Sequence, residues 1–536
     1  VDPNAGAEIL FREINVDDSN ELSDRRPINP SGESLSFCSI NIYIRVKIYD
    51  ERGAEQVKQF SCETPRSTTL KGLTARVIQA DGSVTVLDNA DLITSDNFRD
   101  GDELRTRYRF PIPDLRPGVI VDIKWKETFK GLADDHLFSL GDELPIRTSL
   151  LKFKHREKYI CYFNTHNVPD GMKEGNYGVW SAVAQNVPIV PDEPYLPPSF
   201  GIQPWVCVFY ASNTNYIQRD EFWKYFSKAL DELLRFEGKS GNSAVSAKTA
   251  ELTRGITDPK EKLRVLYEFC MREIANLDYS NSGYSEADIK EIDDDMEWGD
   301  VQDSAETLKS GRGHKWEISI LFAAMAQSAG FETQIALCND RSYLEWDINT
   351  LTGRMVPSMI VAVKNGDKWE YYQPGAHYMP FGMLRGGNEG TIAVLSNPDK
   401  AEFVLTPTAP STDSVLSRTG TFTIDADGTL QGNAVFHYSG HKATSAKNAY
   451  AGMTLEARTD QFEDEVRASV PGAEISELQF DNIDDPCKDL EIRFKMTVPG
   501  FAEVTGERLL FQPSVFEKAS KPVFTTETRS FDIRFP

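Results

Sequence analysis

Two periodicities divide the chain. From Ser36 to about residue 212, apolar and polar residues alternate with period two, as in the run 39–49, and this alternation is typical of strands with one buried face. Near Tyr216 the spacing becomes helical, with apolar stripes over 222–234, 244–256 and 259–277. After about residue 406 strands return, interrupted by a helical pair within 441–469. The pattern predicts a multidomain α+β protein with an N-terminal antiparallel β-sandwich, a central α+β core and a β-rich α+β C-terminal domain.

The most distinct predicted element is a buried helix between two glycine-marked ends. It starts after Gly311-Arg312-Gly313 and ends before Gly330. Its apolar residues follow the spacing of a core-facing stripe, and they are Ile318, Leu321, Phe322, Met325 and Ala329. Gly330 stands where a left-handed helix cap is expected, and a strand over 331–337 follows.

Two polar stretches are predicted to lie outside regular elements. Residues 1–34 form a polar lead-in with a short amphipathic start at 9–14, and the run 286–300 forms an acidic loop that contains Trp298. The acidic loop is either a cation site or a solvated loop near a cleft mouth. The sequence lacks the glycine spacing of an EF-hand, which favours the solvated loop.

Length and charge narrow the classes of protein. The chain of 536 residues is too long for a single core. A net charge of −24 and a pI near 4.8 argue against nucleic acid and anionic membrane surfaces as partners. No apolar run approaches the roughly 20 residues of a membrane-spanning helix. The chain begins with Val1 rather than methionine, which suggests a mature or trimmed chain whose targeting segment is not visible.

Neither the cysteines nor the histidines form a recognisable cluster. Seven of each are scattered without a CxxC pair or a zinc-type spacing. We therefore expect no disulfide framework, no metal site and no cofactor.

The region around the predicted helix resembles the transglutaminase-like superfamily, which shares the Cys/His/Asp chemistry of papain. In that family a glycine-rich turn delivers a cysteine to the start of such a helix, a histidine opens a later strand, and an aspartate ends the strand after it. The positive end of the helix lowers the thiol pKa, and the histidine and aspartate complete the path of proton transfer.

In this sequence all three of those positions differ from the family pattern. Lys315 stands where the cysteine belongs, Ser358 where the histidine belongs, and Gln373 where the aspartate belongs. The flanking features are kept, namely Gly313, Gly330, the turn Asn365-Gly366-Asp367 and Pro374. Three substitutions in register predict a degenerate transglutaminase-like (papain-like) core that retains the scaffold without its chemistry.

Lys315 has two interpretations. It could be a nucleophile or Schiff-base former with a lowered pKa, or a solvated lysine at a helix start, paired with Glu317. An ammonium at a helix N-terminus is disfavoured by about 0.3–1 kcal/mol. Activation would need desolvation or a positioned base, so we favour the solvated lysine.

A polar groove around these positions is the predicted binding cleft. His377 lies four residues past Gln373, where a structural histidine is favoured over a replacement base. The degenerate triad positions and cleft candidates together are Lys315, Ser358, Gln373, His314, Trp316, Glu317, Trp298 and His377.

The N-terminal region has a second resemblance. The segments 47–53, 81–83 and 110–121 are similar to an uncharacterised β domain that precedes the transglutaminase-like core in bacterial envelope proteins, and the C-terminal region is similar to the domain that follows it. The resemblance implies a periplasmic or envelope location in a Gram-negative bacterium and carries no known activity.

These expectations combine into one functional hypothesis. Residues 1–215 form the β-sandwich domain of unknown function, 216–405 the degenerate core, and 406–536 the C-terminal domain. The protein is predicted to be a non-catalytic scaffold of the cell envelope whose cleft binds a peptide, protein or glycan. The alternatives are an active cysteine peptidase or transglutaminase with a relocated nucleophile, Cys338 or Lys315, and a carbohydrate-binding sandwich.

Overall fold

A computed structural model describes residues 2–21, 36–65, 68–87, 93–100, 103–130, 135–156, 159–211, 218–279, 281–295, 301–517 and 522–534. The chain divides into two compact units. The first contains residues 1–222, 342–355 and 529–535, and the second contains residues 223–341 and 356–528. The three domains predicted from sequence are a finer division, which stays a prediction.

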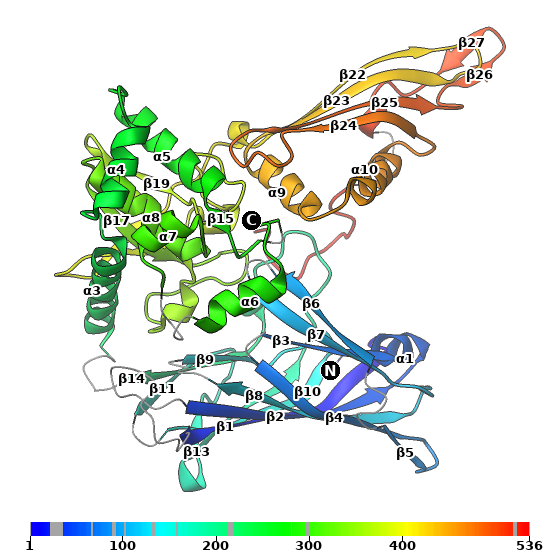
Figure 1. Cartoon of the computed structure of the whole chain (residues 1–536). Helices are drawn as coiled ribbons and strands as arrows, with labels where there is room; N and C mark the ends of the chain where they lie inside the picture. The colour runs from blue at the N-terminus through cyan, green and yellow to red at the C-terminus, as the bar shows by residue number, and fades with distance from the viewer. Residues whose placement is uncertain are drawn as a thin grey trace. The chain divides into compact units, whose positions relative to one another are not determined.

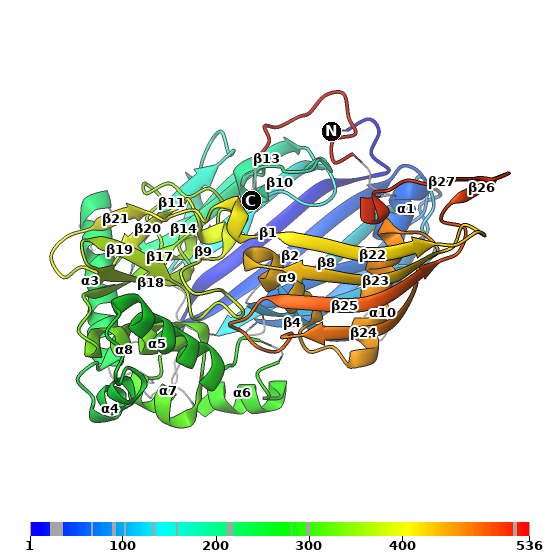
Figure 2. The same cartoon turned by 90° about the horizontal axis from the view of Figure 1, so that it is seen from above.

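The first unit is built on one large sheet, whose strands lie side by side in Figure 2. The strand order is β12-β13-β10-β1-β2-β8-β4-β5. The strands are β12 (Lys173–Glu174), β13 (Val179–Val187), β10 (Ile146–Lys154), β1 (Ala7–Glu21), β2 (Ser36–Ile48), β8 (Ile120–Lys130), β4 (Thr68–Ile78) and β5 (Val84–Leu87). Neighbours are antiparallel, except that β1 and β10 run parallel, which departs from the predicted antiparallel pattern.

Two smaller sheets complete the sandwich. One has the order β11-β14-β9 and the other β3-β7-β6. Their strands are β11 (Ile160–His166), β14 (Trp205–Ala211), β9 (Asp135–Ser139), β3 (Gln59–Pro65), β7 (Glu103–Pro111) and β6 (Ile93–Asp100), with the short helices α1 (Glu51–Val57) and α2 (Ser199–Ile202). All three sheets contribute to one buried apolar cluster, for example Val121, Phe153, Phe110 and Val208. Burial of this shared apolar surface is the main force holding the sheets together.

The N-terminal segment is an interior strand, and the predicted polar lead-in is wrong for residues 7–21. β1 lies between β10 and β2, and its apolar side chains, such as Ile14 and Val16, enter the core. Glu8, Arg12 and Asp18 are also buried, and each has charged or hydrogen-bonding partners within the unit. These charges broke the apolar alternation that identified the other strands. Residues 22–35 lie outside the described part of the chain.

The second unit begins with helices around a buried one (Figure 1). They are α3 (Arg219–Gly238), α4 (Ser243–Leu252), α5 (Pro259–Glu273), α6 (Glu286–Asp295), α7 (Ser304–Ser310) and α8 (Lys315–Ser328). α8 packs on α4, α5 and α7 and against a sheet of order β19-β18-β17-β20-β21. These strands are β19 (Lys368–Tyr372), β18 (Ser358–Asn365), β17 (Thr333–Cys338), β20 (Ile392–Leu395) and β21 (Glu402–Leu405). The predicted buried helix is confirmed, including a left-handed Gly330 with φ 94° just after its end.

The predicted acidic loop is a helix over 286–295. Ser285 and Asp288 form reciprocal hydrogen bonds, in which the Ser285 N–H donates to Asp288 Oδ2 at 2.9 Å and the Asp288 N–H donates to Ser285 Oγ at 3.2 Å. This capping box starts α6 and is the local signal that outweighed the acidic composition. Trp298 and the rest of 296–300 lie outside the described residues.

The remainder of the second unit is a four-stranded sheet covered by two helices. The sheet has the order β22-β23-β25-β24. Its strands are β22 (Leu416–Ile424), β23 (Leu430–Tyr438), β25 (Leu490–Val498) and β24 (Glu474–Asp481), with α9 (Gly440–Tyr450), α10 (Leu455–Ser469) and the hairpin β26 (Glu503–Thr505) and β27 (Arg508–Leu510). Phe462 of α10 packs edge-on against Phe436 and Phe494 of the sheet. The predicted C-terminal α+β arrangement is confirmed.

One excursion of the chain belongs to the first unit. Residues 342–355 leave the second unit after β17, and Leu344 and Met355 pack with Cys207 of β14 in a small apolar cluster. Within the described residues, no helix combines the length and apolar character needed to cross a bilayer.

Candidate functional site

A short turn delivers the start of α8. α7 ends at Gly311, which has a left-handed backbone (φ 66°), and β16 (Arg312–Gly313) then pairs in parallel with β15 (Ala275–Asn276). A Cβ at Gly313 would lie 3.0 Å from Glu317 Oε2 and 3.1 Å from Thr307 Cγ2, so a larger residue would crowd this turn. Lys315 is therefore the first residue of α8, at the position that the Gly-x-Gly pattern predicted.

Two carboxylates engage the backbone donors at this helix start. Asp278 Oδ2 accepts the Lys315 N–H at 2.7 Å, and its Oδ1 lies 3.0 Å from His314 Nδ1. Glu317 Oε2 accepts the His314 N–H at 2.8 Å, and its Oε1 accepts the Gln302 N–H at 2.7 Å. Carboxylates are favoured here because they satisfy unpaired helix donors and face the positive end of the helix.

The two carboxyl groups differ in their pKa. Burial disfavours the charge of Asp278, but the His314 hydrogen bond and the Lys315 N–H outweigh it and hold the pKa below its ordinary value. For Glu317 burial dominates and raises the pKa, against the hydrogen bonds from the His314 and Gln302 backbones. The end of the helix that would favour a thiolate is thus already engaged by carboxyl groups of the protein.

The loop after β19 lies directly against Lys315. The Lys315 carbonyl accepts the Ser319 Oγ–H at 2.8 Å, and a Cβ on Gly375 would come within 2.1 Å of that carbonyl oxygen. Asn276 Nδ2 donates to the Gly375 carbonyl at 3.0 Å and holds the loop in place. Only glycine permits this approach.

Ser358 opens β18 and pairs with Cys338 at the end of β17. Cys338 Sγ lies 3.6 Å from the Ser358 carbonyl oxygen. The side chain of Cys338 is fully buried, and this burial raises its pKa. A thiol in such surroundings stays protonated at neutral pH and is a poor nucleophile.

Gln373 holds a neighbouring loop. Its Oε1 accepts the Arg385 N–H at 2.9 Å and its Nε2 donates to Asn388 Oδ1 at 2.9 Å. Asn388 in turn donates to the Asn339 carbonyl at 3.0 Å, and its own carbonyl accepts the Thr406 Oγ–H at 2.7 Å. Gln373 is 4% exposed, so its amide N–H and its carbonyl oxygen both need hydrogen-bond partners inside the protein. An ionised aspartate has no donor for the Asn388 oxygen.

The three predicted positions lie at the ends of neighbouring elements. Lys315 is the first residue of α8, Ser358 the first of β18, and Gln373 the first after β19. α8 packs on β18, which pairs with β19. The hydrogen bonds described for the Gln373 side chain lead to loop 385–391 and not toward α8.

His377 is enclosed by tyrosines. Its ring lies 4.8 Å from the Tyr279 ring and 3.9 Å from the Tyr378 ring, and its Nε2 lies 3.2 Å from Asn281 Nδ2. Burial, with a smaller effect of Lys447, lowers the pKa of His377 to about 4. The imidazole is therefore neutral at pH 7, in keeping with a structural histidine.

Three of the other candidates are described by the structure and one is not. His314 and Glu317 take part in the carboxylate contacts at the helix start, and Trp316 is half-buried in the first turn of α8. Trp298 is outside the described residues. Sequence reasoning missed Asp278 and Asn276, because only the two-residue pairing of β15 with β16 brings them to α8.

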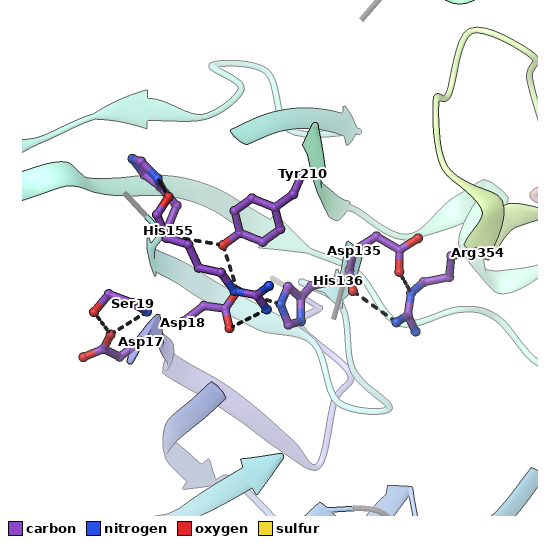
Figure 3. A network of polar contacts seen from close by, with 9 residues as sticks. Asp17, Asp18, Ser19, Asp135, His136, His155, Tyr210 and Arg354 are labelled. Atoms are coloured by element: carbon purple, nitrogen blue, oxygen red, sulfur yellow. Dashed lines mark hydrogen bonds and ion pairs between the residues drawn. The ribbon is translucent and has the colours of Figure 1, made fainter. Parts of the chain in front are cut away.

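A second set of cysteine, histidine and aspartate residues lies in the first unit, and Figure 3 draws the aspartate and the histidine of this set. Asp18, Cys38 and His136 come from β1, β2 and β9, and one potential ligand atom of each lies within 4.8 Å of the others. All three residues are buried, and Cys38 is 2% exposed. No sequence pattern indicated this cluster, since its members are far apart along the chain and only strand pairing brings them together.

Asp18 is the centre of this cluster, as Figure 3 shows. Its Oδ2 accepts the Tyr210 O–H at 2.8 Å and lies 3.2 Å from His136 Nε2 and 3.2 Å from Arg156 Nε. Its Oδ1 accepts Arg156 Nη2–H at 3.3 Å. Burial opposes the charge of Asp18, but its partners, His136 first, hold its pKa below the ordinary value.

These contacts are typical of a structural cluster that stabilises the fold and not of a reactive centre. Burial and the Asp18 charge raise the pKa of Cys38, and His136 directs its Nε2 at Asp18. Asp18, Cys38 and His136 are ligand types that suit zinc, but a cation would have to displace the Arg156 guanidinium from Asp18. The cluster ties β1 to β9 and β14 across the sandwich.

Two segments of the chain match known protein families. Residues 39–191 match DUF3857, described as a domain of unknown function with solved structure, and residues 246–380 match the transglutaminase-like superfamily. No curated protein matches the chain.

Among solved structures, the fold is similar to that of a candidate protease from Parabacteroides distasonis. The identity is 12% and the TM-score is 0.53, over 96% of this chain and 95% of that chain. A candidate cysteine protease from Cytophaga hutchinsonii is also similar, with 9% identity over 67% of this chain and 78% of that chain, at a TM-score of only 0.16. At such identities the likeness concerns the fold alone. The chain therefore combines an N-terminal DUF3857 domain with a transglutaminase-like core.

Proposed function

We propose that this protein is a non-catalytic member of the transglutaminase-like superfamily that acts in a bacterial cell envelope as a binding or scaffold protein. Its ligand would be a peptide, protein or glycan held around the start of α8. The observation that carries the proposal is the carboxylate pair at that helix start, where Asp278 and Glu317 engage the backbone N–H groups of Lys315 and His314.

The chemical requirements of thiol catalysis support a non-catalytic role. Thiol catalysis in this fold needs an anion stabilised by the helix N-terminus and a base that can accept its proton. Here the backbone donors already serve carboxylates, Lys315 carries a cation instead of a thiol, and Gln373 is engaged in a buried amide network. These engaged groups stabilise the fold and favour a non-catalytic role over thiol chemistry.

The competing proposal is an active peptidase or transglutaminase with a relocated nucleophile. The description of the Parabacteroides protein as a candidate protease keeps this alternative open. Its candidates here are Cys338, which is buried with a raised pKa, and Lys315. The burial of Cys338 and its raised pKa both argue against Cys338 as a relocated nucleophile.

Chemical trapping separates the two proposals. The full chain is incubated at pH 7 with a peptide carrying a vinyl-sulfone electrophile, and separately with an aldehyde plus borohydride, and adducts are located by peptide mass spectrometry. We expect no stoichiometric adduct on Cys338 or Lys315. A single stoichiometric adduct on either residue, abolished by Cys338→Ala or Lys315→Gln, would establish the enzyme instead.

Binding and location need their own measurements. A thermal-shift panel of short peptides and oligosaccharides is expected to give at least one ligand whose stabilisation is lost in Trp316→Ala and kept in Trp369→Ala, a tryptophan of β19. Fractionation of the host cells is expected to recover the protein with the envelope. A stabilising ligand that is indifferent to Trp316 would move the binding site elsewhere.

A further inference from the structure

A group of lysines on the outer face of the large sheet stands out in this acidic protein. Lys71 of β4 and Lys126 of β8 are directly paired across the strands, and Lys124 is the next outward residue of β8. All three side chains are exposed. Like charges directly opposite each other on a sheet are destabilising, so this pairing costs stability in the free protein.

Carboxylates of the described residues do not neutralise this group. Within the described chain, the ion pairs of the outer face involve other cations. Arg45 and Arg76 share Asp122 at 2.7 and 2.6 Å, and Lys152 pairs with Glu13 at 2.8 Å. Lys71, Lys124 and Lys126 thus present positive charge from a molecule whose net charge is −24.

The lysines line a groove that also contains amide and aromatic groups. The groove has a volume of about 290 Å³, and its lining includes Asn15, Asn41, Tyr43 and Glu13 besides the three lysines. A bulge between Lys71 and Thr74, with a left-handed Gly72 (φ 65°), shapes one end. Phe11 lies beside Tyr43 with ring centroids 6.3 Å apart, giving a half-exposed aromatic surface.

The strand register arranges these groups as a row across the sheet. Asn15 pairs with Asn41, Asn41 with Lys126, and Lys126 with Lys71. With neighbouring strands about 4.8 Å apart, this row is roughly 14 Å long. Three of its four strands, β1, β2 and β8, pair on both sides along the row, so a peptide could not add a strand there, because strand addition requires a free sheet edge. The fourth strand, β4, pairs with β5 only from Ala75 to Ile78, beyond Lys71.

We propose that this row is a binding site for an acidic oligosaccharide, a chain of sugars that carries carboxylate groups. The ammonium groups of Lys71, Lys124 and Lys126 bind the carboxylates. Asn15 and Asn41 each offer a donor and an acceptor to sugar hydroxyls, and Tyr43 offers a ring face to the sugar. Glu13, held by Lys152, borders the site and would disfavour a ligand of continuous high charge density.

Matched ligands test the proposal on the full chain by calorimetry at low ionic strength. The probe is a tetramer of galacturonic acid, its neutral control is the fully methyl-esterified tetramer, and poly-glutamate of equal charge represents an acidic peptide. We expect the acid tetramer to bind, the ester to bind at least about tenfold more weakly, and binding to weaken as salt screens the lysines.

Variants locate the site. K71Q/K126Q is expected to weaken binding of the acid tetramer at least about tenfold while leaving the melting temperature unchanged or raised, because it removes a like-charge pair. K58Q/K173Q makes the same change in charge on two other exposed lysines of this unit, which pair with Glu55 and Asp170, and should leave binding unchanged. N15A/N41A should weaken the sugar without altering the weak binding of poly-glutamate.

Three results would overturn the proposal. These are an acid tetramer that does not bind, equal losses in the two lysine double variants, and poly-glutamate that binds as tightly as the tetramer with no effect of N15A/N41A. The last result would assign the row to acidic peptides. Because the row lies in the first unit, none of these results bears on the proposed role of α8.

Discussion

The same three residue types meet in one region of this protein and are predicted to be replaced in another. Cys38, His136 and Asp18 converge inside the first unit, where Cys38 is 2% exposed and Arg156 neutralises the aspartate. In the transglutaminase-like core, the sequence pattern predicts Lys315, Ser358 and Gln373 at the corresponding positions of the family. The identity of side chains is therefore a poor guide to chemistry unless access, charge and a helix end accompany it.

The two regions also differ in how they use buried carboxylates. In the first unit Asp18 is held by side chains of three other strands or loops, so it joins distant parts of the sandwich. In the core Asp278 and Glu317 are held mainly by backbone N–H groups around a helix start. Loss of the first type removes a buried counter-charge of Arg156, whereas loss of the second removes helix caps, and the expected costs differ accordingly.

Removal of the Asp18 carboxylate should have the largest effect. Asp18→Ala removes the Asp18 carboxylate from the buried Arg156 guanidinium and is expected to lower the free energy of unfolding by about 3–5 kcal/mol, measured by urea denaturation. Asp17→Ala is the matched control, because the described hydrogen bonds of Asp17 go to its neighbour Ser19, and it should cost less than about 1 kcal/mol. Equal effects of both variants would mean that the cluster around Asp18 does not stabilise the first unit.

Crowding at the start of α8 should come next. Gly375→Ala drives a methyl group toward the Lys315 carbonyl oxygen and is expected to cost about 2–3 kcal/mol. Gly386→Ala, where an added Cβ meets no atom within 4 Å, serves as the control and should be nearly neutral. A harmless Gly375→Ala, seen as an unchanged thermal midpoint, would show that the loop after β19 is not packed against α8.

The Asp278 carboxylate should give a smaller effect with a defined pH dependence. Its pKa is lowered in the folded state, so its contribution is complete above the ordinary aspartate pKa and disappears as the pH falls through the folded value. Asp278→Asn is expected to cost about 1–2 kcal/mol at pH 7 and less at the acid end. Denaturation curves of both proteins between pH 7 and acid conditions measure this difference. Glu317, whose pKa is raised, should show the opposite trend in Glu317→Gln.

Thiol labelling should give the smallest effect. Burial raises the pKa of Cys38 and Cys338, so iodoacetamide at pH 7 should leave both unmodified in the native protein and modify both in urea. Mass spectrometry of tryptic peptides measures the labelled fraction. Rapid native labelling of Cys38 would show that the cluster in the first unit is open to solvent, which would remove the contrast between the two regions.

Sequence periodicity identified the elements whose burial is simple. α8 and the strands β17, β18 and β19 follow the predicted order, because an apolar stripe and the turn at Asn365-Gly366 specify them locally. β1 was missed because it carries the buried charges Glu8, Arg12 and Asp18, which only tertiary partners compensate. α6 was missed because its Ser285–Asp288 capping box was less conspicuous than its acidic composition.

The ends of the elements that carry the candidate residues were predictable, but the contacts of these residues were not. Lys315 lies at the helix start and Gln373 directly after β19, while their match to the family's catalytic positions stays a prediction. The partners of these residues, Asp278 and Asn388, follow from chain crossings that no local pattern encodes. Patterns of spacing report where an element begins, while hydrogen-bond partners depend on which loops return to it.

The excursion of residues 342–355 into the first unit has a consequence for vectorial synthesis. A ribosome synthesises the strands of the sandwich long before Leu344 and Met355. The apolar surface around Cys207 therefore stays exposed until most of the second unit's helices have been made. The segment near Arg529, which donates to the Pro194 carbonyl at 2.6 Å, arrives later still. A fragment that stops at residue 222 would therefore expose this surface permanently, and we expect it to aggregate unless residues 342–355 are supplied with it.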